Sequence, residues 1–464
     1  MFSSIKKIHF VGIGGIGMSG IAEILLNRGF EISGSDLNEN DNTEYLRSKG
    51  AKITIGHFPE NVNGQDVVVY SSAVNPDENP ETLEARRQGI PVIRRAEMLA
   101  EATRLNYSIA IAGTHGKTTT TSMIGLILIK AGYDPTVIVG GRLKDFGGTN
   151  ARLGKGEWTV LEADEFDRSF LQLFPSIAVI NNIEPEHLDI YDGIEDLKTT
   201  FLQFANKVPF YGFVALGTDD PNVKEILSGI NKKTITFGMS RNNDYYAKDI
   251  ELQENFSKFI LVQNSKIIGE ISLNVPGYHN VKNALAAVAV TTEMGIDFSI
   301  IKAALQEFTG VIRRFDIKGE IDGIMIVDDY AHHPTEIRAT LDAARKGWDR
   351  RIIAVFQPHT YSRTQEFYKE FAQAFDDADV LVITDVYAAR ENPIPGISGE
   401  LIAQQAKIYG HKNVHYIPDF ENIIEFLLSE LKQGDMLITI GAGNISKISQ
   451  LIKEKLEVLI NNKI

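Results

Sequence analysis

The sequence contains no cysteine, which excludes disulfide bonds and zinc sites built from thiolates. No apolar stretch approaches the roughly 20 residues that a membrane-spanning helix needs. The start of the chain passes from Lys6-Lys7 directly into a candidate strand and lacks the apolar core of a secretory signal. We therefore expect a cytoplasmic protein with no membrane insertion.

Positive charge is scarcer than negative charge, with 47 Lys and Arg against 61 Asp and Glu, a net charge of −14. This balance disfavours nucleic acid as a partner, because a basic surface would have to form within an acidic whole. The chain has 464 residues, 43% of them hydrophobic. Single hydrophobic cores rarely exceed roughly 250 to 300 residues, so we expect about three domains.

Residues 109–120 read as an apolar strand, a loop Gly113-x-x-Gly116-Lys117-Thr118 and the start of an apolar helix. Glycines allow backbone N–H groups to turn toward phosphate oxygens, Lys117 supplies a positive charge, and the Thr118 hydroxyl suits Mg²⁺. The segment predicts a site for ATP or GTP. The spacing from Gly113 to Gly116 is three positions, shorter than in the usual phosphate-binding loop.

A second glycine loop, Gly12-x-Gly14-x-x-Gly17, follows the first candidate strand, and Asp36 ends the second strand. This pattern is typical of dinucleotide binding, with the acidic residue placed to bind a ribose hydroxyl. It specifies a diphosphate at a helix N-terminus, so a UDP-sugar satisfies it as well as NAD does. From this segment alone a dehydrogenase remains open.

Candidate strands alternate with helical patterns along the whole chain, which is typical of doubly wound α/β folds. We predict three consecutive α/β domains with boundaries after residues 104 and 315. The expected strands are residues 8–11, 31–33, 52–55, 67–71, 92–93, 159–162, 177–181, 325–328, 351–356, 380–384 and 436–440, with a hairpin at 258–262 and 266–273.

Polar side chains follow several of these strands, where an open parallel sheet places its ligands. Glu162 ends an apolar strand and is a candidate metal ligand, and His187 follows another. For His187, ligation of a second Mg²⁺ and a structural hydrogen bond both remain open. Asp328, Asp329, His332 and His333 leave a transition-metal site open. This interpretation is the less favoured one, since neighbours on an extended chain point in opposite directions.

In order, these motifs resemble the Mur ligases of peptidoglycan synthesis over nearly the whole chain. They are residues 113–118, 162–165, 182–187, 279–283, 313–315 and 328–336. Residues 12–17, 94–97 and 356–359 are most similar to the members that join L-alanine to UDP-N-acetylmuramate. A near relative is the murein tripeptide ligase of recycling.

The resemblance implies a Rossmann-like domain for the UDP-sugar at 1–104, a central P-loop ATPase domain at 105–315, and a Rossmann-like domain for the amino acid at 316–464. It implies ATP and Mg²⁺ as cofactors, with UDP-N-acetylmuramate and L-alanine as substrates. ATP would phosphorylate the carboxylate, and the amine of L-alanine would attack the acyl phosphate.

The resemblance also assigns residues to these ligands. Lys117, Glu162 and His187 would be catalytic, and Thr118, Glu162 and His187 would bind Mg²⁺. The remaining assignments are Gly113, Thr114, His115, Gly116, Lys117, Thr118, Thr119, Asn280, Asn283, Arg314 and Asp329 for ATP; Gly12, Gly14, Gly15, Gly17 and Asp36 for the UDP-sugar; and His332, His359 and Arg363 for the amino acid.

Three positions depart from the family pattern: Glu186 stands where Asp is usual, Ala331 where Gly is frequent, and Thr360 where Arg is frequent. Two other classes of function remain. An NAD-dependent oxidoreductase would leave Lys117, Glu162 and His187 without a role. A P-loop switch or transport ATPase would explain the central domain but not the first domain. The oligomeric state, with a homodimer as one outcome, and the strictness for L-alanine are open.

Overall fold

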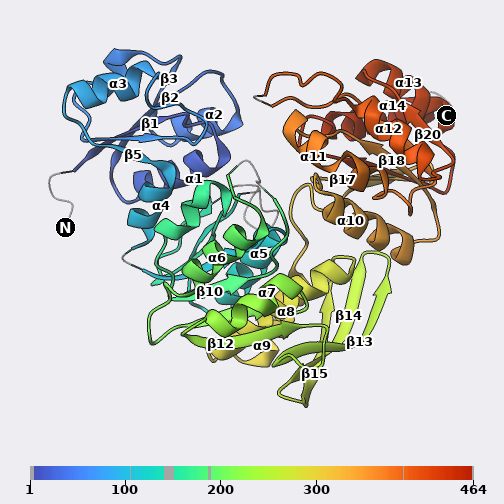
Figure 1. Ribbon diagram of the computed structural model, residues 1–464, viewed down its shortest axis with the longest axis horizontal. Coiled ribbons are helices and arrows are strands. Elements are labelled where there is room, and N and C mark those ends of the chain that lie inside the picture. The colour runs from blue at the N-terminus through green and yellow to red at the C-terminus, as the bar shows by residue number, and fades with distance from the viewer. Residues whose placement is uncertain (1–4, 105, 141–150, 187–189, 390, 462–464) are drawn as a thin grey trace. The chain divides into compact units, whose positions relative to one another are not determined.

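The computed structural model of the protein describes residues 5–104, 106–140, 151–186, 190–389 and 391–461. In this range the chain forms three sheets with helices packed on them (Figure 1). The chain divides into two compact units. The first comprises Met1–Lys248, Ile260–Ile271 and Lys282–Phe308, and the second comprises Asp249–Phe259, Ser272–Val281 and Thr309–Ile464.

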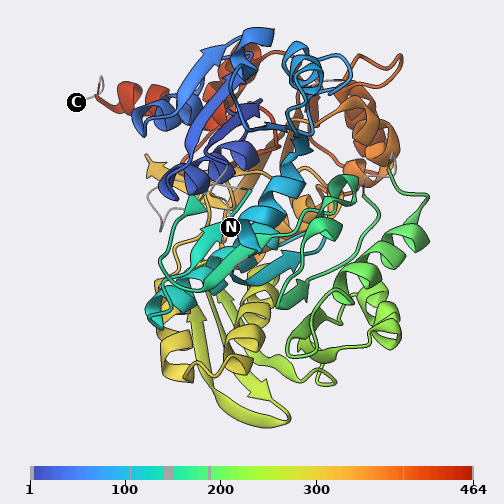
Figure 2. The ribbon, with the colours of Figure 1, turned by 90° about the vertical axis from the view of Figure 1, so that its left-hand side faces the viewer.

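The first sheet has five parallel strands in the order β3-β2-β1-β4-β5, the blue arrows of Figure 2. Its elements are β1 (Lys7–Val11), α1 (Ile16–Asn27), β2 (Glu31–Asp36), α2 (Asp41–Ser48), β3 (Lys52–Ile55), η1 (Pro59–Val62), β4 (Val67–Tyr70), α3 (Pro80–Arg87), β5 (Val92–Arg94) and α4 (Arg95–Thr103). The strand order reverses between β1 and β4, and ligands of such sheets bind at that point.

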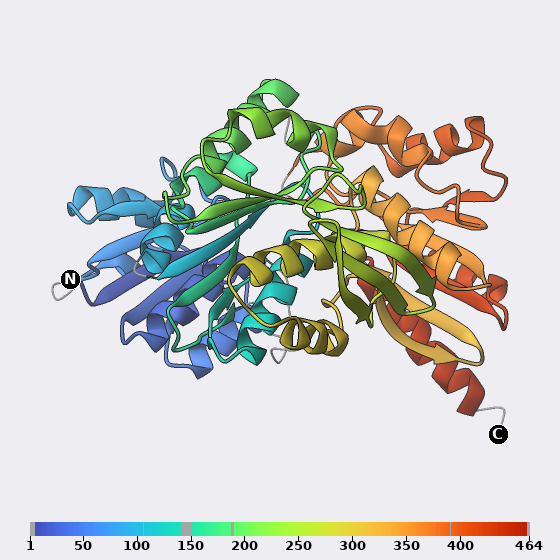
Figure 3. The same cartoon turned by 90° about the horizontal axis from the view of Figure 1, so that it is seen from below.

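The central sheet has ten strands in the order β15-β14-β13-β12-β11-β10-β6-β9-β7-β8. Its strands are β6 (Tyr107–Ala112), β7 (Thr136–Ile138), β8 (Ala151–Arg152), β9 (Trp158–Glu162), β10 (Ile177–Ile180), β11 (Phe213–Gly217), β12 (Lys233–Gly238), β13 (Tyr245–Gln253), β14 (Phe256–Gln263) and β15 (Lys266–Leu273). The expected hairpin is confirmed as β14 and β15, among the yellow-green strands of Figure 3.

The helices of this region are α5 (Lys117–Lys130), η3 (Phe166–Gln172), α6 (Ile194–Ala205), α7 (Pro221–Ile226), η4 (Leu227–Gly229), α8 (Tyr278–Glu293) and α9 (Phe298–Glu307). Strand β10 is buried along its whole length, as expected for a parallel strand covered on both faces. Helix α5 approaches β7 closely, since a Cβ at Gly125 would lie 2.9 Å from a methyl of Val137. This contact brings the middle of α5 close to the sheet.

The third sheet has six strands in the order β16-β17-β21-β18-β19-β20, of which only β16 runs antiparallel to its neighbour among the pairings described. Its elements are β16 (Asp316–Ile321), β17 (Ile324–Asp329), α10 (Pro334–Gly347), β18 (Arg351–Phe356), α11 (Tyr361–Ala372), β19 (Val380–Ile383), α12 (Gly399–Ile408), β20 (Val414–Tyr416), α13 (Phe420–Glu430), β21 (Asp435–Ile440) and α14 (Ser446–Asn461). Separate apolar clusters cover its two faces.

The three α/β arrangements confirm the expected fold class. The domain boundaries at residues 104 and 315 stay predictions. In the described part of the chain, no helix has both the length and the apolar character needed to cross a membrane.

Candidate active site

The loop between β6 and α5 needs glycine at two positions. Gly113 has φ +132° and Gly116 has φ +81°, a backbone region that other residues rarely adopt. A Cβ at Gly116 would lie 2.3 Å from Oδ1 of Asn283, and one at Gly113 would lie 3.1 Å from the backbone nitrogen of Asn182. The two glycines therefore allow both the turn and its close contact with neighbouring asparagines.

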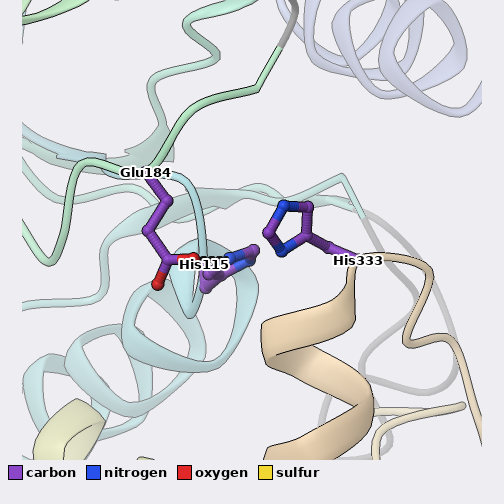
Figure 4. Close-up of side chains that lie close together, drawn as sticks. All are labelled: His115, Glu184 and His333. Atoms are coloured by element: carbon purple, nitrogen blue, oxygen red, sulfur yellow. Dashed lines mark ion pairs between the residues drawn. The ribbon is translucent and has the colours of Figure 1, made fainter. Parts of the chain in front are cut away.

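The segment after β10 holds this loop in place. The backbone N–H of His115 donates to Oδ1 of Asn182 at 2.8 Å, and the N–H of Glu184 donates to the hydroxyl of Thr114 at 2.9 Å. Figure 4 shows the side chains of His115 and Glu184 side by side, with Nε2 and Oε2 3.5 Å apart. The third side chain drawn there, His333, belongs to the second unit. The segment after β10 thus helps to fix the shape of this loop.

Lys117 is bound by protein groups at the start of α5. Its ammonium donates to the carbonyl oxygen of Gly113 at 2.6 Å and to both carboxylate oxygens of Glu165 at 2.9 Å. Burial raises the pKa of Glu165 to about 7, although the charge of Lys117 acts in the opposite direction. Burial also disfavours the charge of Lys117, but the carboxylates of Glu165, Asp164 and Glu186 outweigh it and raise the pKa of Lys117.

Thr118 and Glu162, two of the expected metal ligands, lie together. Glu162 accepts the N–H of Gly140 at 2.8 Å and the hydroxyl of Thr118. Burial raises the pKa of Glu162. A carboxylate and a hydroxyl are the hard oxygen ligands that Mg²⁺ takes, so these residues fit the ion. The third expected ligand, His187, lies outside the described residues.

Residues of β2 hold the glycine loop of the first sheet in place by hydrogen bonds. The N–H groups of Gly12 and Ile13 donate to the carbonyl oxygen of Ser35 at 2.8 and 3.0 Å. The N–H of Gly14 donates to Oδ2 of Asp36 at 2.8 Å. Asp36, the residue expected at the ribose, therefore also shapes the loop. The assignment of this loop and of Asp36 to the UDP-sugar stays a prediction.

A cavity of about 200 Å³ lies in the first unit beside this loop. Arg94 donates to the hydroxyl of Tyr70 at 3.1 Å and to Asp167 at 3.2 Å. The guanidinium of Arg95 lies over Gly17, with Nη1 2.6 Å from where a Cβ would stand. Arg94 and Arg95, at the start of α4, bring two cations to this cavity, and Arg95 also lies at the start of α1, which suits an anion. Asp167 and Asp164 lie 3.2 and 3.7 Å from the two guanidinium groups. It is lined by Tyr70, Ser72, Val74, Pro76, Arg94, Arg95, Ala96, Glu97, Phe166, Asp167, Ser169 and Gln172.

The second unit brings together the three residues expected at the amino acid. Nη1 of Arg363 is 3.3 Å from Nδ1 of His359, and the rings of His332 and His359 are 6.0 Å apart. Burial lowers the pKa of His359 to about 4, and the charges of His332 and Arg363 add to this effect. Thr360 caps α11 with φ +65°, which is rare for a branched residue and typical of functional sites.

Three of the residues expected at the nucleotide also lie in the second unit. Asp329 accepts the N–H groups of Phe315 and Ala331, each at 2.7 Å, and burial raises its pKa to about 6. Arg314 donates to Glu336 at 3.3 Å. The third, Asn280, donates to the carbonyl oxygen of Pro276 at 2.7 Å. Asn283 lies in the first unit and accepts the hydroxyl of Thr120 at 3.4 Å.

Models of one protein family match successive parts of the chain. Residues 7–107 match the catalytic domain of the Mur ligase family, residues 111–291 match the Mur ligase middle domain, and residues 313–443 match the Mur ligase glutamate ligase domain. The chain belongs to the Mur ligase family.

Similar members of the Mur ligase family include two proteins named UDP-N-acetylmuramate–L-alanine ligase. The protein of Geotalea daltonii is 53% identical and that of Geotalea uraniireducens is 54% identical, each over 98% of this chain and 99% of the relative. Among solved structures, the UDP-N-acetylmuramate-alanine ligase of Thermotoga maritima has a TM-score of 0.84 at 31% identity, covering 97% of this chain and 99% of that one. The murein peptide ligase of Psychrobacter arcticus has a TM-score of 0.71 at 26% identity, covering 97% and 98%.

Sequence reasoning missed the partners of several Mur ligase motif residues. Glu165 was visible in the motif 162–165, but nothing in the pattern paired it with Lys117. Arg94 and Arg95 were noted only for their resemblance, although two adjacent cations after a strand are a signal for an anion. Glu186, a departure from the family pattern, is 7% exposed and contributes negative charge near Lys117.

Proposed function

We propose that this protein is the ATP-dependent ligase that joins L-alanine to the carboxylate of UDP-N-acetylmuramate, with release of ADP and phosphate, in peptidoglycan precursor synthesis. The observation that carries the proposal is the identity of 53% with a ligase of that name over 98% of the chain. The cytoplasmic location expected from the sequence is part of this proposal.

The reaction needs activation of a carboxylate, which by itself is a poor acylating agent. A carboxylate oxygen of the sugar attacks the γ-phosphorus, the bond to ADP breaks, and an acyl phosphate forms. The amine of L-alanine then attacks the acyl carbon, loses a proton, and phosphate leaves. We assign Lys117 to the phosphoryl oxygens, where a preorganised cation stabilises the charge of the transition state.

The same assignment gives Lys117 a change of partner. In the structure its ammonium is 2.9 Å from Glu165, and a phosphate would compete with that carboxylate. Thr118 and Glu162 would hold Mg²⁺, which neutralises phosphate charge when bound. His187 stays assigned to a second Mg²⁺ from the resemblance. The remaining loop residues Gly113, Thr114, His115, Gly116 and Thr119, with Asn280, Asn283, Arg314 and Asp329, stay assigned to the nucleotide.

For the UDP-sugar we propose the loop of Gly12, Gly14, Gly15 and Gly17 with Asp36, extended by Arg94 and Arg95. The position of the Arg95 guanidinium over Gly17 supports this extension, because it adds a cation to the N-terminal end of α1. The cavity beside it has room for a small anionic group.

For L-alanine we propose His332, His359 and Arg363 in the second unit. The planar fork of Arg363 can bind both oxygens of the alanine carboxylate. The lowered pKa of His359 keeps its ring neutral at physiological pH, so that it does not compete with Arg363 for the carboxylate.

Phosphate release tests this function. The purified protein should release phosphate from ATP only when Mg²⁺, UDP-N-acetylmuramate and L-alanine are all present. Activity with a preformed tripeptide but not with free L-alanine would favour the recycling ligase instead. Tight binding in an NADH fluorescence titration would restore the dehydrogenase hypothesis for the first domain.

A further inference from the structure

A buried carboxylate lies behind the glycine loop of the first sheet and belongs to none of the sites above. Glu81, at the start of α3, is 0% exposed. Its Oε2 accepts the hydroxyl of Ser35 at 2.5 Å and lies 3.2 Å from Nδ1 of His57. Its Oε1 accepts Nδ2 of Asn61 at 2.5 Å. Burying a carboxylate is costly unless it is fully hydrogen-bonded, so each of these contacts matters.

A second histidine completes the environment of Glu81. His9 is 1% exposed, its Nδ1 is 2.8 Å from the hydroxyl oxygen of Ser33, and its Nε2 is 3.6 Å from Oε2 of Glu81. Burial favours the neutral acid, but the contacts with His9, Ser35 and Asn61 outweigh it and hold the pKa of Glu81 below its ordinary value. Glu81 is therefore a charged carboxylate at neutral pH.

Ser35 connects this carboxylate to the glycine loop. Its hydroxyl binds Glu81, and its carbonyl oxygen accepts the N–H groups of Gly12 and Ile13 at 2.8 and 3.0 Å. Ser35 and Glu81 are both 0% exposed, so neither side chain can touch a ligand on the loop. Any effect of Glu81 on binding must act through the position of Ser35.

We propose that Glu81 is a positioning residue for the UDP-sugar: by holding Ser35 it sets the conformation in which the turn at Gly12 and Ile13 receives the diphosphate. The proposal rests on the proposed function, since it takes the loop to be the UDP-sugar site. A carboxylate accepts hydrogen bonds at both oxygens, whereas an amide places a donor at one of them. Glu81→Gln would thus either turn its NH₂ toward the Nδ2 donor of Asn61 or turn it toward Ser35, whose hydroxyl would then have to rotate and accept instead of donating.

The test compares wild type, Glu81→Gln, Ser35→Ala and the double variant. We expect either single variant to raise the KM for UDP-N-acetylmuramate about tenfold, as for loss of a hydrogen bond to a charged group. The turnover number and the KM values for ATP and L-alanine should stay within about twofold, since those ligands bind elsewhere. Because both changes act on the same contact between Ser35 and Glu81, the double variant should raise the KM for UDP-N-acetylmuramate no more than the single variant with the larger effect does. Glu84→Gln, on the same helix but bonded to Arg87 at the surface, is the matched control.

Three results would overturn the proposal. One is an unchanged KM for UDP-N-acetylmuramate in folded Glu81→Gln. A lower melting temperature with an unchanged KM would mean that Glu81 contributes to stability only. Another is a double variant whose effect is the product of the two single effects. The third is a Kd for UDP-N-acetylmuramate, measured by calorimetry, that is the same in Glu81→Gln as in the wild type. This measurement tests the role of Glu81 even if the wild type forms no product. Absence of ligase activity in the wild type would count against the proposed function instead.

Discussion

The ammonium of Lys117 lies 2.9 Å from both carboxylate oxygens of Glu165, and Glu165 is 1% exposed. The ion pair occupies the start of the helix that follows the phosphate loop. It gives Lys117 a stabilising partner that a phosphate would have to replace. With Lys117 assigned to the phosphates as proposed, the free energy of this pair would affect both stability and nucleotide binding.

Lys117→Ala should destabilise the protein and abolish most of its activity. Breaking a buried ion pair by removing one partner costs about 3 to 5 kcal/mol, whereas removing both costs less. We expect Lys117→Ala to lower the melting temperature and the double variant Lys117→Ala/Glu165→Gln to recover more than half of that loss. Turnover should fall on the order of 100-fold or more in both, because the cation at the phosphoryl group is gone.

The control for this prediction is Lys130→Ala at the far end of α5, where the lysine pairs with Glu307 at the surface. It should leave turnover unchanged. Wild-type turnover in Lys117→Ala would contradict the assignment. A double variant less stable than Lys117→Ala would contradict the energetic role of the pair.

The sequence predicted the strands and loops better than the partners of the site residues. Strand β18 has the bounds expected from its apolar run, because buried parallel strands are nearly continuous hydrophobic runs. His332, His359 and Arg363 were assigned together by resemblance, and the sheet brings them together. The pair of Lys117 with Glu165 could not be predicted, because it depends on how β9 and α5 pack, which local patterns do not determine.

Glu162→Ala should raise the Mg²⁺ concentration needed for half-maximal activity. The carboxylate accepts the hydroxyl of Thr118, and the two form a pair of oxygen ligands for the ion. Activity titrated with Mg²⁺ at saturating ATP measures the change. Glu157→Ala removes an exposed carboxylate just before the same strand and should leave the titration unchanged. Identical Mg²⁺ curves for Glu162→Ala and wild type would exclude Glu162 as a ligand.

His359 should make the protein less stable in mild acid. Its pKa is lowered from 6.5 to about 4 by burial, so the unfolded chain takes up the proton first as pH falls. The stability from the neutral ring is complete above the unfolded pKa and is lost between 6.5 and about 4. By about pH 5 the loss is on the order of 2 kcal/mol. Between neutral pH and about pH 5, the melting temperature of the wild type should therefore fall more than that of His359→Gln. Equal falls in the two proteins would contradict a buried His359 with a lowered pKa.

Arg363→Lys should weaken binding of L-alanine selectively. The substitution keeps the positive charge but loses the planar fork that can bind two carboxylate oxygens. Losing one charge-assisted hydrogen bond costs roughly 1.5 to 3 kcal/mol, which corresponds to about a tenfold to hundredfold rise in the KM for L-alanine. The KM values for ATP and UDP-N-acetylmuramate should change little, since other residues are assigned to those ligands. Arg338→Lys, an exposed arginine on α10, should leave all three values unchanged. An unchanged KM for L-alanine in folded Arg363→Lys would mean that another residue binds the carboxylate, and Arg314 would then be the next arginine of the second unit to test.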